Sequence, residues 1–128
     1  MSDWKWVGVG SALAAHREQL KLFGGGDGVR DQGLLESALA RAQHLASYGS
    51  PDLAELAASY AYGIAKNHPF IDGNKRVALM VCEAFIVKNG SSLNATNSEL
   101  SVLFLDLAAG EISEAELADW FRTRIQPA

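Results

Sequence analysis

Residues 68–76 read His68-Pro69-Phe70-Ile71-Asp72-Gly73-Asn74-Lys75-Arg76. This stretch combines a proton acceptor, a carboxylate, a flexible glycine, an amide and two cations. Asp72-Gly73-Asn74 is typical of a turn, and the apolar residues that follow it as far as Val87 predict a largely buried helix. The sequence therefore predicts a polar cluster at the N-terminus of a helix.

The N-terminus of this helix is expected to favour an anion. It presents unpaired backbone N–H groups and the positive end of the helix dipole. Gly73 lets the backbone approach a phosphate closely, Lys75 adds a point charge, and Arg76 adds a planar fork that matches two phosphate oxygens. These residues indicate a site for a nucleotide phosphate.

Asp72 is the exception in this cluster, because a carboxylate repels a phosphate. A bridging Mg²⁺ removes the conflict, since proteins usually hold this ion with one or two carboxylates together with the phosphates of the substrate. We therefore expect Asp72 to be a metal ligand.

His68 precedes the turn and suits general-base chemistry near neutral pH, which contributes roughly 10²- to 10⁴-fold in rate. Pro69 fixes its own φ and disfavours helical geometry at His68. We expect the imidazole to lie at the end of the preceding helix, one short step from Lys66.

Each of these residues also has an ordinary structural interpretation. A His-Pro pair often ends a helix, Asp-Gly-Asn often forms a turn, and Lys-Arg in a first helical turn is usually solvated. Their coincidence favours a functional site, because a helix cap needs neither a nearby His nor two cations at the positive end of the dipole.

The pattern His-Pro-Phe-x-Asp-Gly-Asn-Lys-Arg resembles the signature of the Fic/Doc family, and Lys75 makes it similar to the Doc (death-on-curing) branch. The resemblance covers nearly the whole chain, through the stretches Gly28–Asp31, Gly33–Arg41, Ala61–Asn67, Asn89–Gly90 and Gly110–Ser113.

The resemblance implies a role for each signature residue. His68 would be the base, Asp72 the Mg²⁺ ligand, Asn74 part of the anion-binding turn, and Lys75 and Arg76 the phosphate clamps. Most Fic proteins carry Gly in place of Lys75 and transfer AMP from ATP to a protein hydroxyl. Doc-type members are thought to transfer the γ-phosphate of ATP to a threonine of elongation factor Tu, which stops translation.

The sequence leaves alternative functions open. Gly73 stands where some Doc proteins have Ala, so adenylyl transfer remains a second interpretation, and a non-catalytic module that binds a partner is a third. Many Fic enzymes inhibit themselves through Ser/Thr-x-x-x-Glu-Gly/Asn, but no Ser or Thr of this chain has Glu four residues later. The resemblance therefore implies inhibition by a separate antitoxin protein.

The composition is that of one globular domain over residues 1–128, since the chain has 128 residues and is 48% hydrophobic. The net charge of −4 argues against nucleic acid as a direct partner. Lys66, Lys75 and Arg76 still form a local basic group that is compatible with a nucleotide. The single cysteine, Cys82, is expected to be a small buried residue.

No apolar run approaches the roughly 20 residues that span a bilayer, and the N-terminal sequence lacks the pattern of a signal peptide. We therefore expect no membrane association and a cytoplasmic location.

The remaining sequence predicts an all-α fold of about six helices. Ser11 is expected to be the N-cap of a first helix, and the flexible Gly24–Gly28 loop ends that helix. No Gly-Lys-Ser/Thr follows these glycines, so they do not indicate a P-loop. Further helices are expected from Asp31 to the break at Tyr48–Pro51, from Asp52 to Asn67, after Thr96-x-x-Glu99 to Gly110, and after Ser113-x-x-Glu116 through Ile125.

Two segments outside these helices also have an expected structure or role. The segment Trp4–Val9 alternates weakly and predicts a short strand or an extended lead-in. The Tyr48–Asp52 loop is expected to overlie the site, as the target-positioning flap of the family does.

Overall fold

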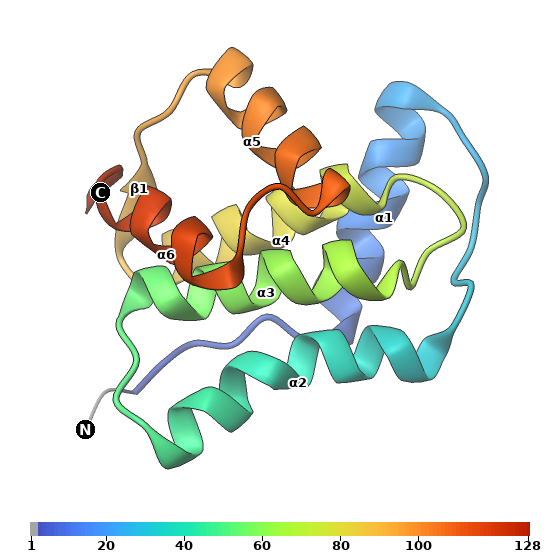
Figure 1. Cartoon of the computed structure of the whole chain (residues 1–128). Coiled ribbons are helices and arrows are strands. Elements are labelled where there is room, and N and C mark those ends of the chain that lie inside the picture. The colour runs from blue at the N-terminus through green and yellow to red at the C-terminus, as the bar shows by residue number, and fades with distance from the viewer. Residues whose placement is uncertain (1–2) are drawn as a thin grey trace.

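The computed structural model describes residues 3–128, which form six α-helices and two short strands (Figure 1). In chain order these are α1 (Val9–Phe23), α2 (Gln32–Tyr48), α3 (Leu53–Asn67), α4 (Asn74–Lys88), β1 (Ser91–Leu93), α5 (Asn97–Ala109), α6 (Glu114–Arg122) and β2 (Ile125–Pro127). The prediction of an all-α bundle of about six helices is confirmed.

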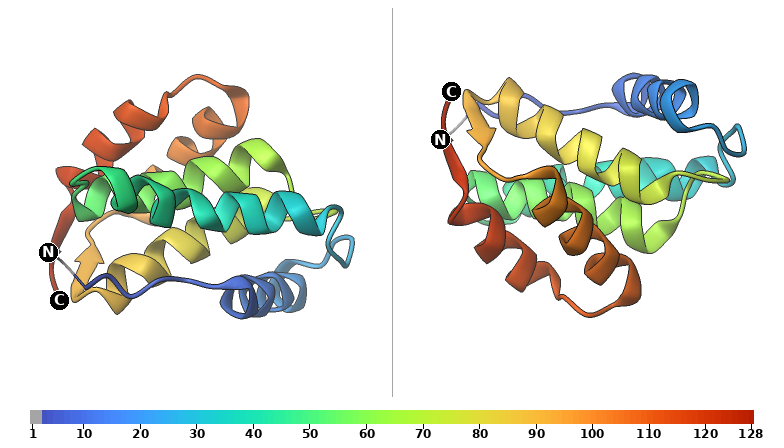
Figure 2. Two further views of the ribbon diagram at one scale, coloured as in Figure 1. Left: turned by 90° about the horizontal axis from the view of Figure 1, so that it is seen from below. Right: turned by 90° about the horizontal axis from the view of Figure 1, so that it is seen from above.

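Helix α3 lies at the centre of the bundle. Ten of its 15 residues are buried, and α2, α4 and α6 pack around it. Many of these buried residues are small, and at Gly63 a Cβ would lie 3.1 Å from the carbonyl oxygen of Ala38, so this glycine permits the close approach of α2. Helix α1 and the α5–α6 pair lie on opposite sides of the bundle (Figure 2).

The predicted capping residues start four of the helices. The Asp31 carboxylate accepts from the Leu34 backbone N–H at 3.0 Å. Asp52, Thr96 and Ser113 each form a capping box with the Glu three residues later. Gly110 ends α5 in the left-handed conformation, with φ of 78°.

The prediction that Ser11 caps the first helix is wrong. The N-cap is Gly8, and Trp4–Gly8 is extended, as one of the two interpretations of this segment held. The reason is a tertiary contact: Val7 is buried, and its backbone N–H donates to the Tyr60 hydroxyl at 3.0 Å. Because this contact holds the backbone at Val7, the helix begins only after it.

The last helix is shorter than predicted, because α6 ends at Arg122. Residues Ile125–Pro127 instead form β2, which pairs antiparallel with β1. Ile125 has an apolar side chain at helical spacing, but in the strand it is partly buried and packs against the same core. Helical spacing alone could not distinguish the two outcomes.

The burial expected for Cys82 is confirmed. Cys82 is fully buried, and burial raises the pKa of its thiol well above the ordinary value. None of the described helices combines the length and the apolar character that crossing a bilayer requires.

Candidate active site

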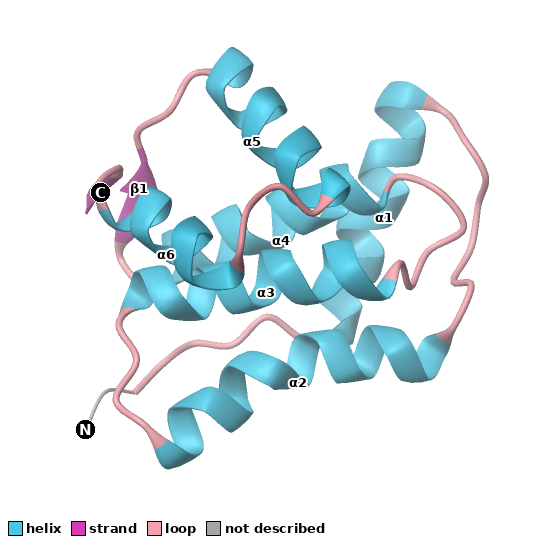
Figure 3. Ribbon diagram, viewed as in Figure 1, coloured by secondary structure: helices cyan, strands magenta, loops and turns pink. Residues whose placement is uncertain are grey.

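Two connections meet at one end of the bundle: residues 24–31 between α1 and α2, and residues 68–73 between α3 and α4 (Figure 3). Val29 and Phe70 form an antiparallel bridge. The Ile71 N–H donates to the Gly28 carbonyl at 3.1 Å. The Gly24–Gly28 loop, expected only to end a helix, therefore lies against the signature.

The Tyr48–Asp52 loop does not overlie the site, so that prediction is wrong. Asp52 caps the N-terminus of α3 and His68 caps its C-terminus. Fifteen helical residues separate the two, a distance of about 22 Å. Tyr48 lines a different pocket, together with Arg41 and Glu114.

His68 is the C-cap of α3, as its proline neighbour predicted. Its φ of 47° and ψ of 56° lie in the left-handed region, and no other non-glycine residue between positions 3 and 128 has a positive φ. The His68 N–H donates to the Ile64 carbonyl at 3.1 Å, and its side chain is exposed at the helix end. The left-handed geometry is costly for a residue with a Cβ, so the surrounding structure must hold it.

The turn after His68 is locked by Asn74. The Phe70 N–H donates to Asn74 Oδ1 and Asn74 Nδ2 donates to the Phe70 carbonyl, each at 3.0 Å. Asn74 is 8% exposed. Both polar atoms of its side-chain amide are thus hydrogen-bonded within the turn, and Asn74 holds the turn in place.

Asp72 and Gly73 form the tip of the turn. The Gly73 N–H donates to Asp72 Oδ1 at 2.8 Å, and Gly73 has a φ of 78°. A Cβ on Gly73 would lie 2.3 Å from Gln19 Nε2, so both the backbone and the packing favour glycine. The Gly25 backbone lies against the Asp72 carboxylate, since a Cβ there would be 2.5 Å from Oδ2.

Helix α4 begins without a side-chain cap, because Gly73 occupies its N-cap position. Lys75 and Arg76, in its first turn, are exposed and have no ion-pair partner within residues 3–128. The Arg76 guanidinium carbon lies 4.1 Å from the centre of the Phe23 ring, a cation–π contact that orients the fork. Lys66 is also exposed, with its Nζ 5.7 Å from the centre of the Tyr62 ring.

Two buried polar residues of α1, His16 and Gln19, pack against the signature turn. The sequence did not lead us to expect this contact. The His16 ring stacks on Phe70 with centroids 4.4 Å apart, and its Nε2 accepts from the Gly28 N–H at 3.2 Å. Burial lowers the pKa of His16. Gln19 is 1% exposed and lies against Gly73. Their i, i+3 spacing in an otherwise apolar helix face was the available signal.

The chain offers a suitable but incomplete set of ligands for Mg²⁺. Within residues 3–128 no group of three or more His, Cys, Asp or Glu side chains is arranged to hold a metal ion. Asp72 supplies one exposed carboxylate beside an uncapped helix end. This donor set fits an ion that takes its other ligands from nucleotide phosphates and water.

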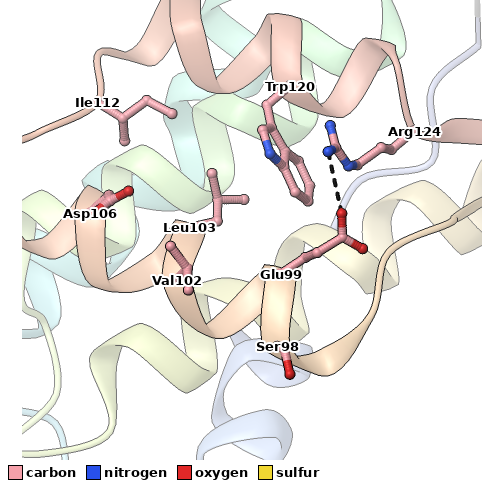
Figure 4. A pocket seen from close by; sticks show the side chains of 8 residues that line it. All are labelled: Ser98, Glu99, Val102, Leu103, Asp106, Ile112, Trp120 and Arg124. Carbon is pink, nitrogen blue, oxygen red and sulfur yellow. Dashed lines mark hydrogen bonds and ion pairs between the residues drawn. The ribbon is translucent and has the colours of Figure 1, made fainter.

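A separate groove of about 450 Å³ lies between α5 and α6, and Figure 4 shows the side chains around it. It is lined by Ser98, Glu99, Val102, Leu103, Asp106, Ile112, Trp120 and Arg124. None of these residues belongs to the signature, so the groove is not part of the candidate active site.

The arrangement combines an exposed histidine at the end of α3 with an uncapped helix start that carries two exposed cations. Comparison with known proteins gives the same family as the sequence. The sequence profile of the Fic/DOC family matches residues 6–86. The chain belongs to the Fic/Doc family.

Two relatives are of the Doc type. The chain is 35% identical over 111 residues to "Protein kinase doc" of Escherichia phage P1, a match that covers 86% of this chain and 87% of that protein. It is 43% identical over 76 residues to "Toxin Doc" of Mycolicibacterium smegmatis, which covers 57% of this chain and 58% of that protein.

Proposed function

We propose that this protein is a Doc-type toxin that transfers the γ-phosphate of ATP to a hydroxyl of a protein target. The observation that carries the proposal is the uncapped first turn of α4, where Lys75 and Arg76 stand beside Asp72 and the preceding His68. The name of the phage P1 relative, a protein kinase, supports the same reaction.

Each residue has a distinct task in this reaction. His68 accepts the proton of the attacking hydroxyl. The open N–H groups of α4 and the cations of Lys75 and Arg76 bind the phosphates. Asp72 would hold Mg²⁺, which would supply neutralising charge. Lys66 adds to the local positive potential.

The bond changes balance without a further reactant. The hydroxyl oxygen forms a bond to the γ-phosphorus, the bond from that phosphorus to the β–γ bridging oxygen breaks, and ADP leaves. The hydroxyl proton passes to His68. The enzyme contributes mostly through positioning and charge neutralisation.

The proposed target is a threonine of elongation factor Tu, and the proposed consequence is arrest of translation in the cytoplasm. A separate antitoxin protein would relieve that arrest. The second relative, whose name is Toxin Doc, supports a toxin and therefore a partner of this kind.

The deciding experiment is incubation of the protein with cell lysate, Mg²⁺ and ATP labelled at either the α- or the γ-phosphate. Label transferred only from the γ position supports the kinase. Label from the α position identifies adenylyl transfer, the reaction that the glycine at position 73 keeps as an alternative. No transfer together with no Mg²⁺-dependent ATP binding points to a non-catalytic binding module.

A further inference from the structure

Arg30 donates hydrogen bonds to three consecutive carbonyl groups at the end of α3. Its Nε reaches the His68 oxygen at 2.7 Å and its Nη2 reaches the Asn67 oxygen at 2.8 Å. Its backbone N–H donates to the Pro69 oxygen at 2.7 Å. One residue of the α1–α2 connection thus contacts the backbone on both sides of His68.

The two side-chain contacts have a specific geometric effect. The Asn67 and His68 carbonyls belong to the two peptide planes that flank the His68 Cα atom. The angles φ and ψ of His68 are the relative orientation of those planes. Because a guanidinium is a rigid planar fork, a bond from each of two of its nitrogens fixes that orientation.

His68 needs such a constraint. It is the one non-glycine residue of positions 3–128 with a positive φ, and this geometry is unfavourable for a side chain with a Cβ. Pro69 disfavours the right-handed helical region at His68, so extended geometry is the alternative. A change from left-handed to extended backbone would redirect the Cα–Cβ bond and move the imidazole.

Arg30 is itself firmly placed. Val29, the preceding residue, bridges to Phe70, and the following Asp31 caps α2. The Asp31 N–H also donates to the Pro69 oxygen at 3.1 Å. The cation additionally suits the negative end of the α3 dipole.

We propose that Arg30 is a positioning residue that holds His68 in its left-handed conformation and so aims the imidazole at the substrate hydroxyl. The inference rests on the role of His68 in the proposed function. Arg30 touches no reacting atom of the proposed reaction and acts only through the backbone of His68.

The first test needs no activity. NMR backbone shifts and couplings that report the φ of His68 are measured in the full chain, unmutated and as Arg30→Ala. We expect the left-handed signature to be lost or averaged in the variant. An unchanged φ overturns the proposal.

The second test is a kinetic cycle of Arg30→Ala, His68→Ala and the double variant, with ATP and the modified protein target. Arg30→Ala should lower kcat by about 10- to 100-fold, since a misplacement of about 1 Å has that effect, and leave KM for ATP within about twofold. In the His68→Ala background, removal of Arg30 should cost nothing further. Losses that multiply in the double variant overturn the proposal.

Two further variants control for stability. Ser113→Ala removes the α6 cap, which contacts neither Arg30 nor the turn after α3, so it should lower stability while kcat stays unchanged. If Arg30→Ala fails to fold, Arg30→Lys replaces it, because an ammonium cannot fix both peptide planes; a φ and kcat equal to those of the unmutated protein then overturn the proposal. A change of φ in a chain without transferase activity supports the positioning role and counts against the proposed function alone.

Discussion

The N-termini of α5 and α4 show two uses of the same chemical feature. Helix α5 begins with a capping box, in which the Thr96 hydroxyl accepts from the Glu99 N–H and the Glu99 carboxylate accepts from the Thr96 N–H. Helix α4 begins at a glycine without a side-chain cap. The first arrangement completes the helix from within, whereas the second leaves donors that only a ligand or water can satisfy.

The charges at the two ends follow the same division. Helix α5 carries Glu99 in its first turn, which stabilises the positive end of its dipole. Helix α4 carries Lys75 and Arg76 there and no acidic residue. This arrangement is unfavourable for the isolated helix and would favour a bound phosphate, so it supports the proposal that the end of α4 binds the nucleotide.

The largest expected effect comes from Lys75→Gly, which removes the cation that distinguishes the α4 end. We expect γ-phosphate transfer to be abolished, because no other ammonium in the first turn attracts that phosphate. Lys88→Gly is the matched control, since it makes the same change in the last turn of α4. Intact-mass measurement of the target distinguishes a phosphoryl from an adenylyl adduct; AMP addition by the unmutated protein that survives Lys75→Gly would contradict the assignment.

His68→Ala should lower transfer by two orders of magnitude or more and leave ATP affinity nearly intact, since a base acts on the chemical step. This variant tests a division of roles between two helix ends. The C-terminus of α3 would supply the base, and the N-terminus of α4 would bind the nucleotide. ATP titration by calorimetry and a transfer assay measure the two properties. Equal transfer rates in variant and parent would remove His68 from the mechanism.

Gly25→Ala should weaken Mg²⁺-dependent ATP binding by about tenfold. Changes to the groups that orient a metal ligand typically lower metal affinity by this order of magnitude. The added Cβ would lie 2.5 Å from Asp72 Oδ2 and displace the carboxylate. Gly24→Ala is the control, because Gly24 also has a positive φ but has open space around its Cβ position. Mg²⁺ titration in the presence of ATP measures both; similar affinities in the two variants would exclude Gly25 from supporting Asp72.

Thr96→Ala tests the capped end directly. Loss of the cap should lower the free energy of unfolding by about 1 kcal/mol. Transfer activity below the unfolding transition should not change, because this helix end lies outside the candidate active site. Urea unfolding and the transfer assay are the measurements, and a loss of ATP binding here would undo the distinction between the two helix ends.

The smallest expected effect is a pH dependence of the free energy of unfolding that arises from the buried His16 side chain. Burial lowers the pKa of His16 below its ordinary value of 6.5, although Asp27, 3.9 Å away, acts in the opposite direction. The unfolded chain therefore takes up this proton first as pH falls, and the free energy of unfolding decreases below about pH 6.5. His16→Gln should reduce that decrease when urea unfolding is compared at pH 7.5 and pH 5.5.

The sequence predicted the parts of the fold and site that depend on neighbouring residues. Asp52 and Thr96 cap helices through contacts with residues three positions away, and the signature residues occupy one turn. Such local hydrogen bonds can be predicted from spacing alone.

The missed features depend on contacts between distant segments. Gln19 and Gly25 meet the turn across more than 45 residues of chain, and Arg30 contacts His68 across 38. The pairing of Ile125 with Leu93 spans 32 residues and placed an expected helical residue in a strand. No local pattern records which loops come together in space.

His68 lies at the end of α3, and Asp72 lies beside the Gly24–Gly28 loop. These two segments are expected to open locally to solvent at different rates. Backbone N–H groups in a buried central helix exchange with solvent only in large, rare openings, whereas exposed glycine-rich segments open locally at little cost. Helix α3 is the first kind of element and the Gly24–Gly28 loop is the second. His68 therefore lies at the end of a helix that is expected to open rarely, whereas the Gly24–Gly28 loop beside Asp72 is expected to open locally far more often.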